Sequence, residues 1–146
     1  MVKQHLEQYL STSLKANNDL WYMKLQVMPL AYHPTPADFI VLSQRHNYLI
    51  ECKECKNEIF AFDRLTQEHD LTTFYKKFVC NRSYIMLMFW KGRLNTSSIF
   101  LIPILAYLRY KKSAKKKSIN LNECNKYFMV YKVITENNIF NLNILL

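Results

Sequence analysis

The chain has 146 residues, enough for one domain with a sizeable core and too few for two ordinary domains. Half of its residues are hydrophobic and 14% are aromatic, a composition that excludes an intrinsically disordered protein. The formal net charge is +9, and residues 71–122 contain eleven Lys or Arg side chains and no Asp or Glu. We therefore expect a single domain over residues 1–146 that binds a polyanion.

The sequence gives no sign of secretion or of a membrane span. The first twenty residues carry four charged side chains and lack the apolar segment of a secretory signal. The longest apolar run, residues 98–108, is shorter than a membrane span and is interrupted by Pro103. We therefore expect a cytoplasmic protein whose four cysteines are reduced thiols.

The hydrophobic pattern of the first half predicts a helix followed by three strands. Residues 3–15 place Leu and Tyr side chains at helical spacing. Residues 20–28 read as a first strand. Residues 38–43 and 47–53, rich in β-branched and aromatic side chains, predict a hairpin.

The pattern continues with a second helix over residues 66–78, for which Thr66 is the expected N-cap and Phe78 lies on the apolar face. Two strands follow at residues 83–90 and 97–103. The resulting order, αβββαβ, predicts an α/β fold with a mixed β-sheet flanked by helices.

The last third of the chain is harder to assign. Residues 104–118 are interpreted as a short apolar turn that leads into a Lys-rich loop. Residues 125–134 are expected to form a last strand, and the final ten or so residues are expected to fray. Trp21 and Trp90 lie in apolar strands, so we expect both side chains in the core.

The stretch YLIECKECKNE, residues 48–58, allows two kinds of site. Cys52 and Cys55 form a C-x-x-C, but a structural zinc site needs four ligands and no second pair is present. On a strand these two thiols would also face opposite sides of the sheet, so packing is the preferred interpretation. Glu51 and Lys53, by contrast, would share one face.

The predicted hairpin brings Asp38 to the same edge of the sheet as Glu51 and Lys53. Two carboxylates and an ammonium group in such a place are unfavourable unless a cation lies between the carboxylates. Mg²⁺ suits this position, because it accepts one or two carboxylates together with water and phosphate oxygens. The lysine can then hold the attacking water or neutralise charge on a scissile phosphate.

These residues resemble a known family. The stretches P-A-D-F-I-V and Y-L-I-E-C-K-E-C-K are similar to the PD-(D/E)xK nuclease motif, with Asp38, Glu51 and Lys53 at its three positions. The thirteen-residue spacing from Asp38 to Glu51 and the continuation to Lys56 most resemble the RecU-type Holliday junction resolvases. Where those proteins carry a stalk, residues 29–37 form a short segment, as in the archaeal Hjc resolvases.

The resemblance implies a restriction-endonuclease-like fold, a symmetric homodimer, Mg²⁺ or Mn²⁺, and paired nicks in four-way DNA junctions. It implies that Asp38 and Glu51 hold the metal, helped by the main-chain carbonyl of Cys52. Lys53 would stabilise the nucleophile or the pentavalent phosphate.

Two further positions are carried over from related proteins. The family has a glutamine in the helix after the lysine, and Gln67 is preferred for this role over His69 because it shares a helical face with apolar residues. This glutamine would orient water or the catalytic lysine. Related resolvases also use an acid of the first helix as a metal ligand, for which Glu7 is the candidate; a solvated helix glutamate is the alternative.

Basic side chains outside the motif are expected to follow the DNA backbone. They are Lys56, Arg64, Lys76, Lys77, Arg82, Lys91, Arg93, Lys111, Lys112, Lys115, Lys116 and Lys117. Two alternative functions stay open: a PD-(D/E)xK nuclease acting on linear or single-stranded DNA, and a non-catalytic DNA-binding protein on the same fold.

Overall fold

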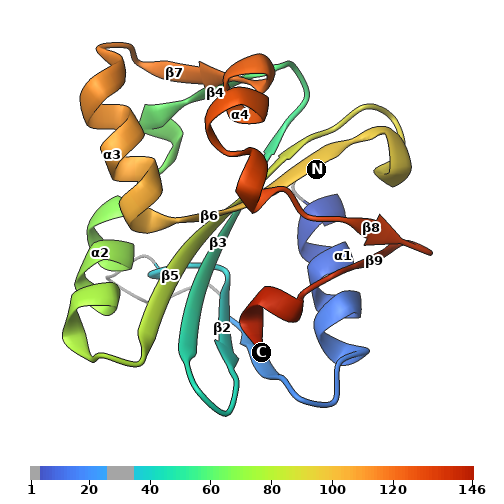
Figure 1. Cartoon of the computed structure of the whole chain (residues 1–146). Helices are drawn as coiled ribbons and strands as arrows, with labels where there is room; N and C mark the ends of the chain where they lie inside the picture. Colours follow the sequence, from blue (N-terminus) through green and yellow to red (C-terminus); the bar gives the residue numbers. More distant parts are fainter. Residues whose placement is uncertain (1–3, 26–34) are drawn as a thin grey trace.

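The protein is described from a computed structural model, which covers residues 4–25 and 35–146. A five-stranded mixed sheet in the order β1-β2-β3-β5-β6 forms its centre (Figure 1). The strands of this sheet are β1 (Trp21–Lys24), β2 (Phe39–Leu42), β3 (Asn47–Cys55), β5 (Asn81–Phe89) and β6 (Ser98–Pro103). β3 and β5 run parallel, and the other neighbouring pairs are antiparallel.

Helices cover both faces of the sheet. α1 (Gln4–Lys15) lies against one face, where Leu6, Leu10 and Leu14 are buried in a core shared with β2, β3 and β5. α2 (Glu68–Lys77) and α3 (Ile104–Ala114) lie against the other face (Figure 1). The two apolar clusters make the sheet a buried layer between helices, as the α/β prediction required.

β3 supplies side chains to both clusters by alternation. Ile50 and Cys52 belong to the cluster beneath α1, whereas Leu49 and Cys55 belong to the cluster beneath α2 and α3. Cys52 and Cys55 therefore lie on opposite faces, as strand periodicity predicted.

The predicted first helix, the β2–β3 hairpin and the strands β5 and β6 are all present, within a few residues of the expected bounds. The expected first strand is shorter in the structure, because β1 ends at Lys24. The rest of that prediction, and most of the segment 29–37 that replaces the stalk, falls within residues 26–34, outside the described residues.

Three local expectations were wrong. Gln67, and not Thr66, is the N-cap of α2, and no side chain caps this helix. Phe78 lies just beyond the helix and is exposed. Trp21 is 55% exposed on β1, the edge strand of the sheet as described. Trp90 is partly buried and stacks on His5 with a centroid distance of 4.6 Å.

The segment expected to be a turn and a Lys-rich loop is mainly a helix. α3 begins directly after Pro103 and ends where Lys115 adopts a left-handed conformation with φ of 53°. Its interior is rich in Leu, Ala, Arg and Lys, which all favour helix, and Ile104 and Tyr107 anchor one face in the core. After it, β7 (Ser118–Asn120) pairs with β4 (Ile59–Ala61) in a small separate sheet.

The predicted last strand was also wrong. Its place is taken by α4 (Leu121–Tyr127) and a 3₁₀ turn, Met129–Tyr131. The side chain of Asn120 accepts a hydrogen bond from the Glu123 amide, and the Glu123 carboxylate accepts one from the Asn120 amide. This capping box starts the helix and outweighs the β-favouring residues that follow.

The end of the chain is packed, contrary to the expectation that it frays. β8 (Thr135–Glu136) and β9 (Ile139–Phe140) form a hairpin beside α1 (Figure 1). Phe140, Leu142 and Leu145 are buried in the α1 cluster. Among the described residues, no helix has the length and apolar character needed to cross a bilayer.

Candidate active site

Asp38 stands directly before β2 and is fixed by three hydrogen bonds. Its amide donates to the Ile50 carbonyl at 3.1 Å, and its carbonyl accepts from the Leu25 amide at 2.7 Å. Its carboxylate oxygen Oδ2 accepts from the Cys52 amide at 2.8 Å. The ladder pairs Phe39 with Ile50, so one further step places Asp38 opposite Glu51.

Glu51 and Lys53 lie side by side on the face of β3 that α2 and α3 cover. Both side chains are buried, and Lys53 Nζ lies 3.8 Å from Glu51 Oε2. Removing both charges from water is costly, and a pair at this distance compensates for only part of that cost. Burial of two charges in one place is typical of a functional site.

The main chain of Cys52 points towards the same edge. Its amide bonds Asp38, and the amide and carbonyl of one residue in a strand point to the same side, so its carbonyl oxygen is also directed to the β2 side. Burial first, and then the charges of Asp38 and Glu51, raise the pKa of the Cys52 thiol well above its usual value. A thiol that stays protonated is a poor metal ligand.

Gln67 occupies the N-cap of α2, the helix that covers the face carrying Glu51 and Lys53. Its carbonyl accepts from the Leu71 amide at 2.9 Å. Within the described part of the chain, its buried side-chain oxygen has no hydrogen-bond partner. His69 is exposed. Of the two residues weighed from the sequence, Gln67 alone presents a buried polar atom.

Glu7 forms an ion pair with Lys24. Its carboxylate lies 2.7 Å from Nζ of Lys24, and this hydrogen bond, with a smaller contribution from Asp38, raises the pKa of Lys24. Lys24 thus links the acid of α1 to the acid before β2. Sequence reasoning did not single out Lys24; the available signal was its place on the strand that follows the helix carrying Glu7.

The oxygen atoms of Asp38, Glu51 and the Cys52 carbonyl suit a hard cation that keeps part of its hydration shell. Among residues 4–25 and 35–146, no three His, Cys, Asp or Glu side chains are arranged to hold a metal. Asp38 and Glu51, on adjacent strands with the Cys52 carbonyl beside them, supply only oxygen. Mg²⁺ and Mn²⁺ accept such a donor set, because few protein ligands are needed when water completes the shell.

Of the basic residues expected to bind DNA, five are engaged within the protein. Arg64 donates to the Glu54 carbonyl and to Cys55 Sγ, and Arg82 donates to two main-chain carbonyls. Three lysines pair with carboxylates: Lys91 with Glu58, Lys111 with Glu68, and Lys116 with Glu123.

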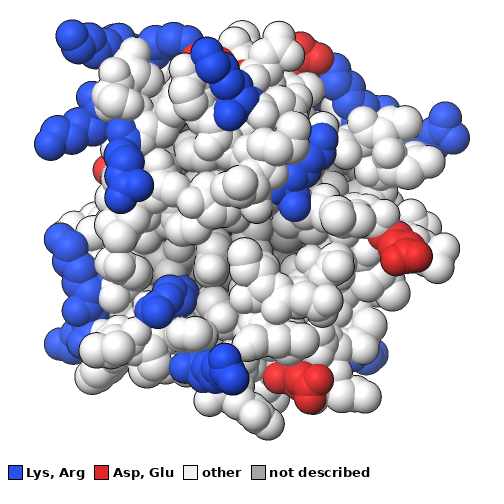
Figure 2. Space-filling view, in the orientation of Figure 1, with Lys and Arg blue, Asp and Glu red and all other residues white. Residues whose placement is uncertain are grey.

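The remaining seven are exposed: Lys56, Lys76, Lys77, Arg93, Lys112, Lys115 and Lys117. Figure 2 shows Lys and Arg side chains spread over α2, α3 and the loop after α3, with few acidic side chains among them. A surface of this kind attracts polyanions.

The fold is the restriction-endonuclease-like α/β fold, with a mixed sheet flanked by helices. No protein-family model matches the chain, and no curated protein matches it. Among solved structures, the chain is similar to Hjc of Archaeoglobus fulgidus, a Holliday junction resolvase from an archaeal hyperthermophile. The TM-score is 0.57 at 16% sequence identity, and the match covers 82% of this chain and 88% of that chain. At this identity the likeness establishes the fold alone.

Proposed function

We propose that the chain is a single nuclease domain, a Mg²⁺-dependent endonuclease that resolves four-way DNA junctions as a homodimer. The observation that carries this proposal is the convergence of Asp38, Glu51 and Lys53 on two adjacent strands. The similarity to Hjc supports it, because that protein has the same fold and is a junction resolvase. Mn²⁺ should substitute for Mg²⁺.

In this proposal Asp38, Glu51 and the Cys52 carbonyl hold the cation, which when bound polarises a phosphate oxygen and activates water. Lys53 stabilises negative charge that develops on the scissile phosphate. Gln67 orients the attacking water or Lys53 through its side-chain oxygen. Glu7 contributes through Lys24, or binds the cation directly when Lys24 turns away.

The exposed lysines and arginines follow the sugar–phosphate backbone. The homodimer is proposed because a four-way junction has approximate two-fold symmetry, so two equivalent sites reach two opposing strands. Mixed dimers of wild type and Glu51→Gln should then nick one strand only.

The decisive experiment compares cleavage of a four-way junction, a fork and a linear duplex in Mg²⁺. The test variant is Lys53→Met, which keeps the volume of the buried side chain and removes its charge. Exposed Lys15→Met, at the end of α1 and outside the proposed catalytic and DNA-binding residues, is the matched control. We expect Lys53→Met to lose at least about a hundredfold in rate while it still binds the junction.

Four results would decide against parts of the proposal. If Lys53→Met cleaves as fast as the control, the convergent residues are not an active site. If wild type cleaves linear duplex as fast as junctions, or is a monomer on DNA, a general PD-(D/E)xK nuclease is the correct function. Equal rates in EDTA and in Mg²⁺ would exclude metal dependence.

A further inference from the structure

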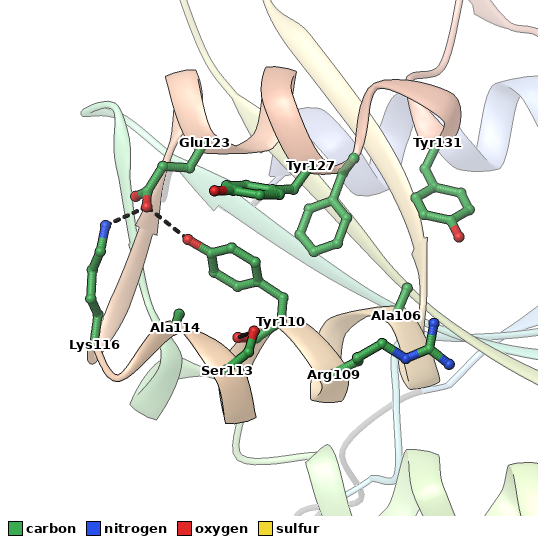
Figure 3. A pocket seen from close by; sticks show the side chains of 10 residues that line it. Ala106, Arg109, Tyr110, Ser113, Ala114, Lys116, Glu123, Tyr127 and Tyr131 are labelled. Carbon is green, nitrogen blue, oxygen red and sulfur yellow. Dashed lines mark hydrogen bonds and ion pairs between the residues drawn. The ribbon is translucent and has the colours of Figure 1, made fainter.

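A cleft of about 520 Å³ lies between α3 and α4 (Figure 3). It is on the side of α3 opposite Lys111, the residue that pairs with Glu68 of α2. Ala106, Arg109 and Tyr110 of α3 form one wall, at the helical spacing that puts them on one face. The cleft is therefore separate from Asp38, Glu51 and Lys53, and none of its residues belongs to the proposed catalytic group.

The opposite wall is aromatic. Tyr127 and Tyr131 point from α4 and the turn that follows it towards α3 (Figure 3), and Phe128 also lines the cleft. Tyr127 lies 5.3 Å from Tyr110 between ring centroids, and Phe128 lies 6.2 Å from Tyr131. Tyr127 is 52% exposed and Tyr131 is partly exposed, whereas Phe128 is buried, so the two tyrosines are the part of this wall that a ligand can reach. Rings that line an open cleft are suited to stacking against a flat partner.

Arg109 faces this wall without an internal partner. Its side chain is exposed, and within the described residues nothing forms a hydrogen bond or ion pair with it. Figure 3 shows its guanidinium group below Tyr131, with the small side chain of Ala106 beside it on the α3 wall. Arg109, Ala106 and Tyr131 line this end of the cleft, which is called the slot below.

The charge of the cleft is positive. The one acid that lines it, Glu123, already bonds Lys116, the Tyr110 hydroxyl and the Asn120 amide. Lys126 stands at the rim, 5.1 Å from the centroid of the Tyr127 ring. A ligand of this cleft therefore combines a flat apolar part with negative charge.

We propose that the slot binds an unpaired nucleotide of DNA. The base stacks between the guanidinium plane of Arg109 and the ring of Tyr131, and the adjoining phosphates face the basic rim. Stacking on aromatic rings and Arg planes beside a basic surface is the usual way proteins hold single strands. This proposal rests on the proposed function and adds that an unpaired nucleotide, as in a fork or at a locally melted junction centre, strengthens binding.

A second copy of the chain fits the cleft less well. If a two-fold axis passed through the cleft, Arg109 and Lys126 of one copy would lie close to the same residues of the other. With the lining acid already engaged, nothing in the described cleft would offset this repulsion.

The test measures DNA binding in EDTA, where cleavage plays no part. The probes are a labelled single-stranded oligothymidine and a labelled duplex of equal length. Their binding is measured by fluorescence anisotropy at physiological salt. Arg109→Ala removes one side of the slot, and Ala106→Leu fills it with a helix-compatible side chain. Lys15→Ala, an exposed position at the end of α1 on the other face of the sheet, controls for loss of charge.

We expect both slot variants to raise Kd for the single strand about tenfold, or about 1.4 kcal/mol, and Kd for the duplex by less than about twofold. The control should change both equally and slightly. A 2-aminopurine placed in the single strand should be quenched by wild type and not by Ala106→Leu. Circular dichroism should show that the variants are folded.

Three results would contradict the proposal that the slot binds an unpaired nucleotide. One is an Ala106→Leu variant, shown to be folded, that binds single strands as wild type does. Another is an equal loss for single strand and duplex, which would make Arg109 a backbone contact. The third is a slot variant that changes the oligomeric state, which would make the cleft an interface between copies. Wild type that binds no DNA would refute the proposed function as well.

Discussion

The side chain of Asp38 has a structural task and a proposed chemical task, and two substitutions can separate them. One carboxylate oxygen accepts the Cys52 amide at 2.8 Å, in a part-buried position. Asp38→Asn keeps an oxygen for this hydrogen bond and removes the negative charge. Asp38→Ala removes both, and leaves the Cys52 amide without its acceptor.

The expected magnitudes follow from these contacts. A buried amide that loses its acceptor costs about 1–3 kcal/mol, so Asp38→Ala should lower the free energy of unfolding by this amount. Asp38→Asn should lower it by less than about 1 kcal/mol. In nicking activity both should lose at least about a hundredfold, because each factor of ten in rate is 1.36 kcal/mol and a metal supplies several.

Urea unfolding gives the stabilities, and nicking of a labelled four-way junction in Mg²⁺ gives the rates. Junction binding, measured in EDTA, should be unchanged or tighter for Asp38→Asn, since it removes a negative charge that faces phosphates. An Asp38→Asn protein that nicks at the wild-type rate would refute the metal-ligand role. If both variants lose binding and activity in step with stability, Asp38 is purely structural.

Two further predictions concern acid stability and the thiols. Hydrogen bonds, first from Lys116 and then from Tyr110, lower the pKa of Glu123 from 4.5 to about 2. Its contribution to stability is therefore complete above pH 4.5 and lost as the pH falls towards 2, and Glu123→Gln should flatten urea-unfolding stability across this window. Exposed Cys80 should react with a thiol reagent before buried Cys52, Cys55 and Cys124. The Cys52→Ser, Cys55→Ser double variant should stay active and zinc-free; stoichiometric zinc in wild type would contradict this.

Strand periodicity was sufficient to predict the centre of the fold. β3 is buried on both faces, and its odd and even residues have different neighbours, so Glu51, Lys53 and Cys52 could be assigned to faces from spacing alone. The hairpin then placed Asp38 opposite Glu51, because an antiparallel pair with a short turn has one register.

The last third could not be predicted in this way. The local composition around Tyr127 favours a strand, and the deciding contact is the reciprocal bond between Asn120 and Glu123. Phe140 and Leu145 depend on contacts with α1, more than a hundred residues earlier in the chain. Arg109 was not among the predicted DNA contacts. Its segment was interpreted as a turn, and only a helix places Arg109 on one face with Ala106 and Tyr110.

The position of β3 determines how the proposed active site is lost when the protein unfolds. This strand is hydrogen-bonded along its length to β5, and at its start to β2, so it belongs to the most protected part of the sheet. Asp38 is held to it by two bonds and cannot separate from Glu51 by local fraying. We therefore expect no separate step of local unfolding at Asp38 and Glu51. On heating, these two residues should keep their geometry until the whole sheet unfolds cooperatively.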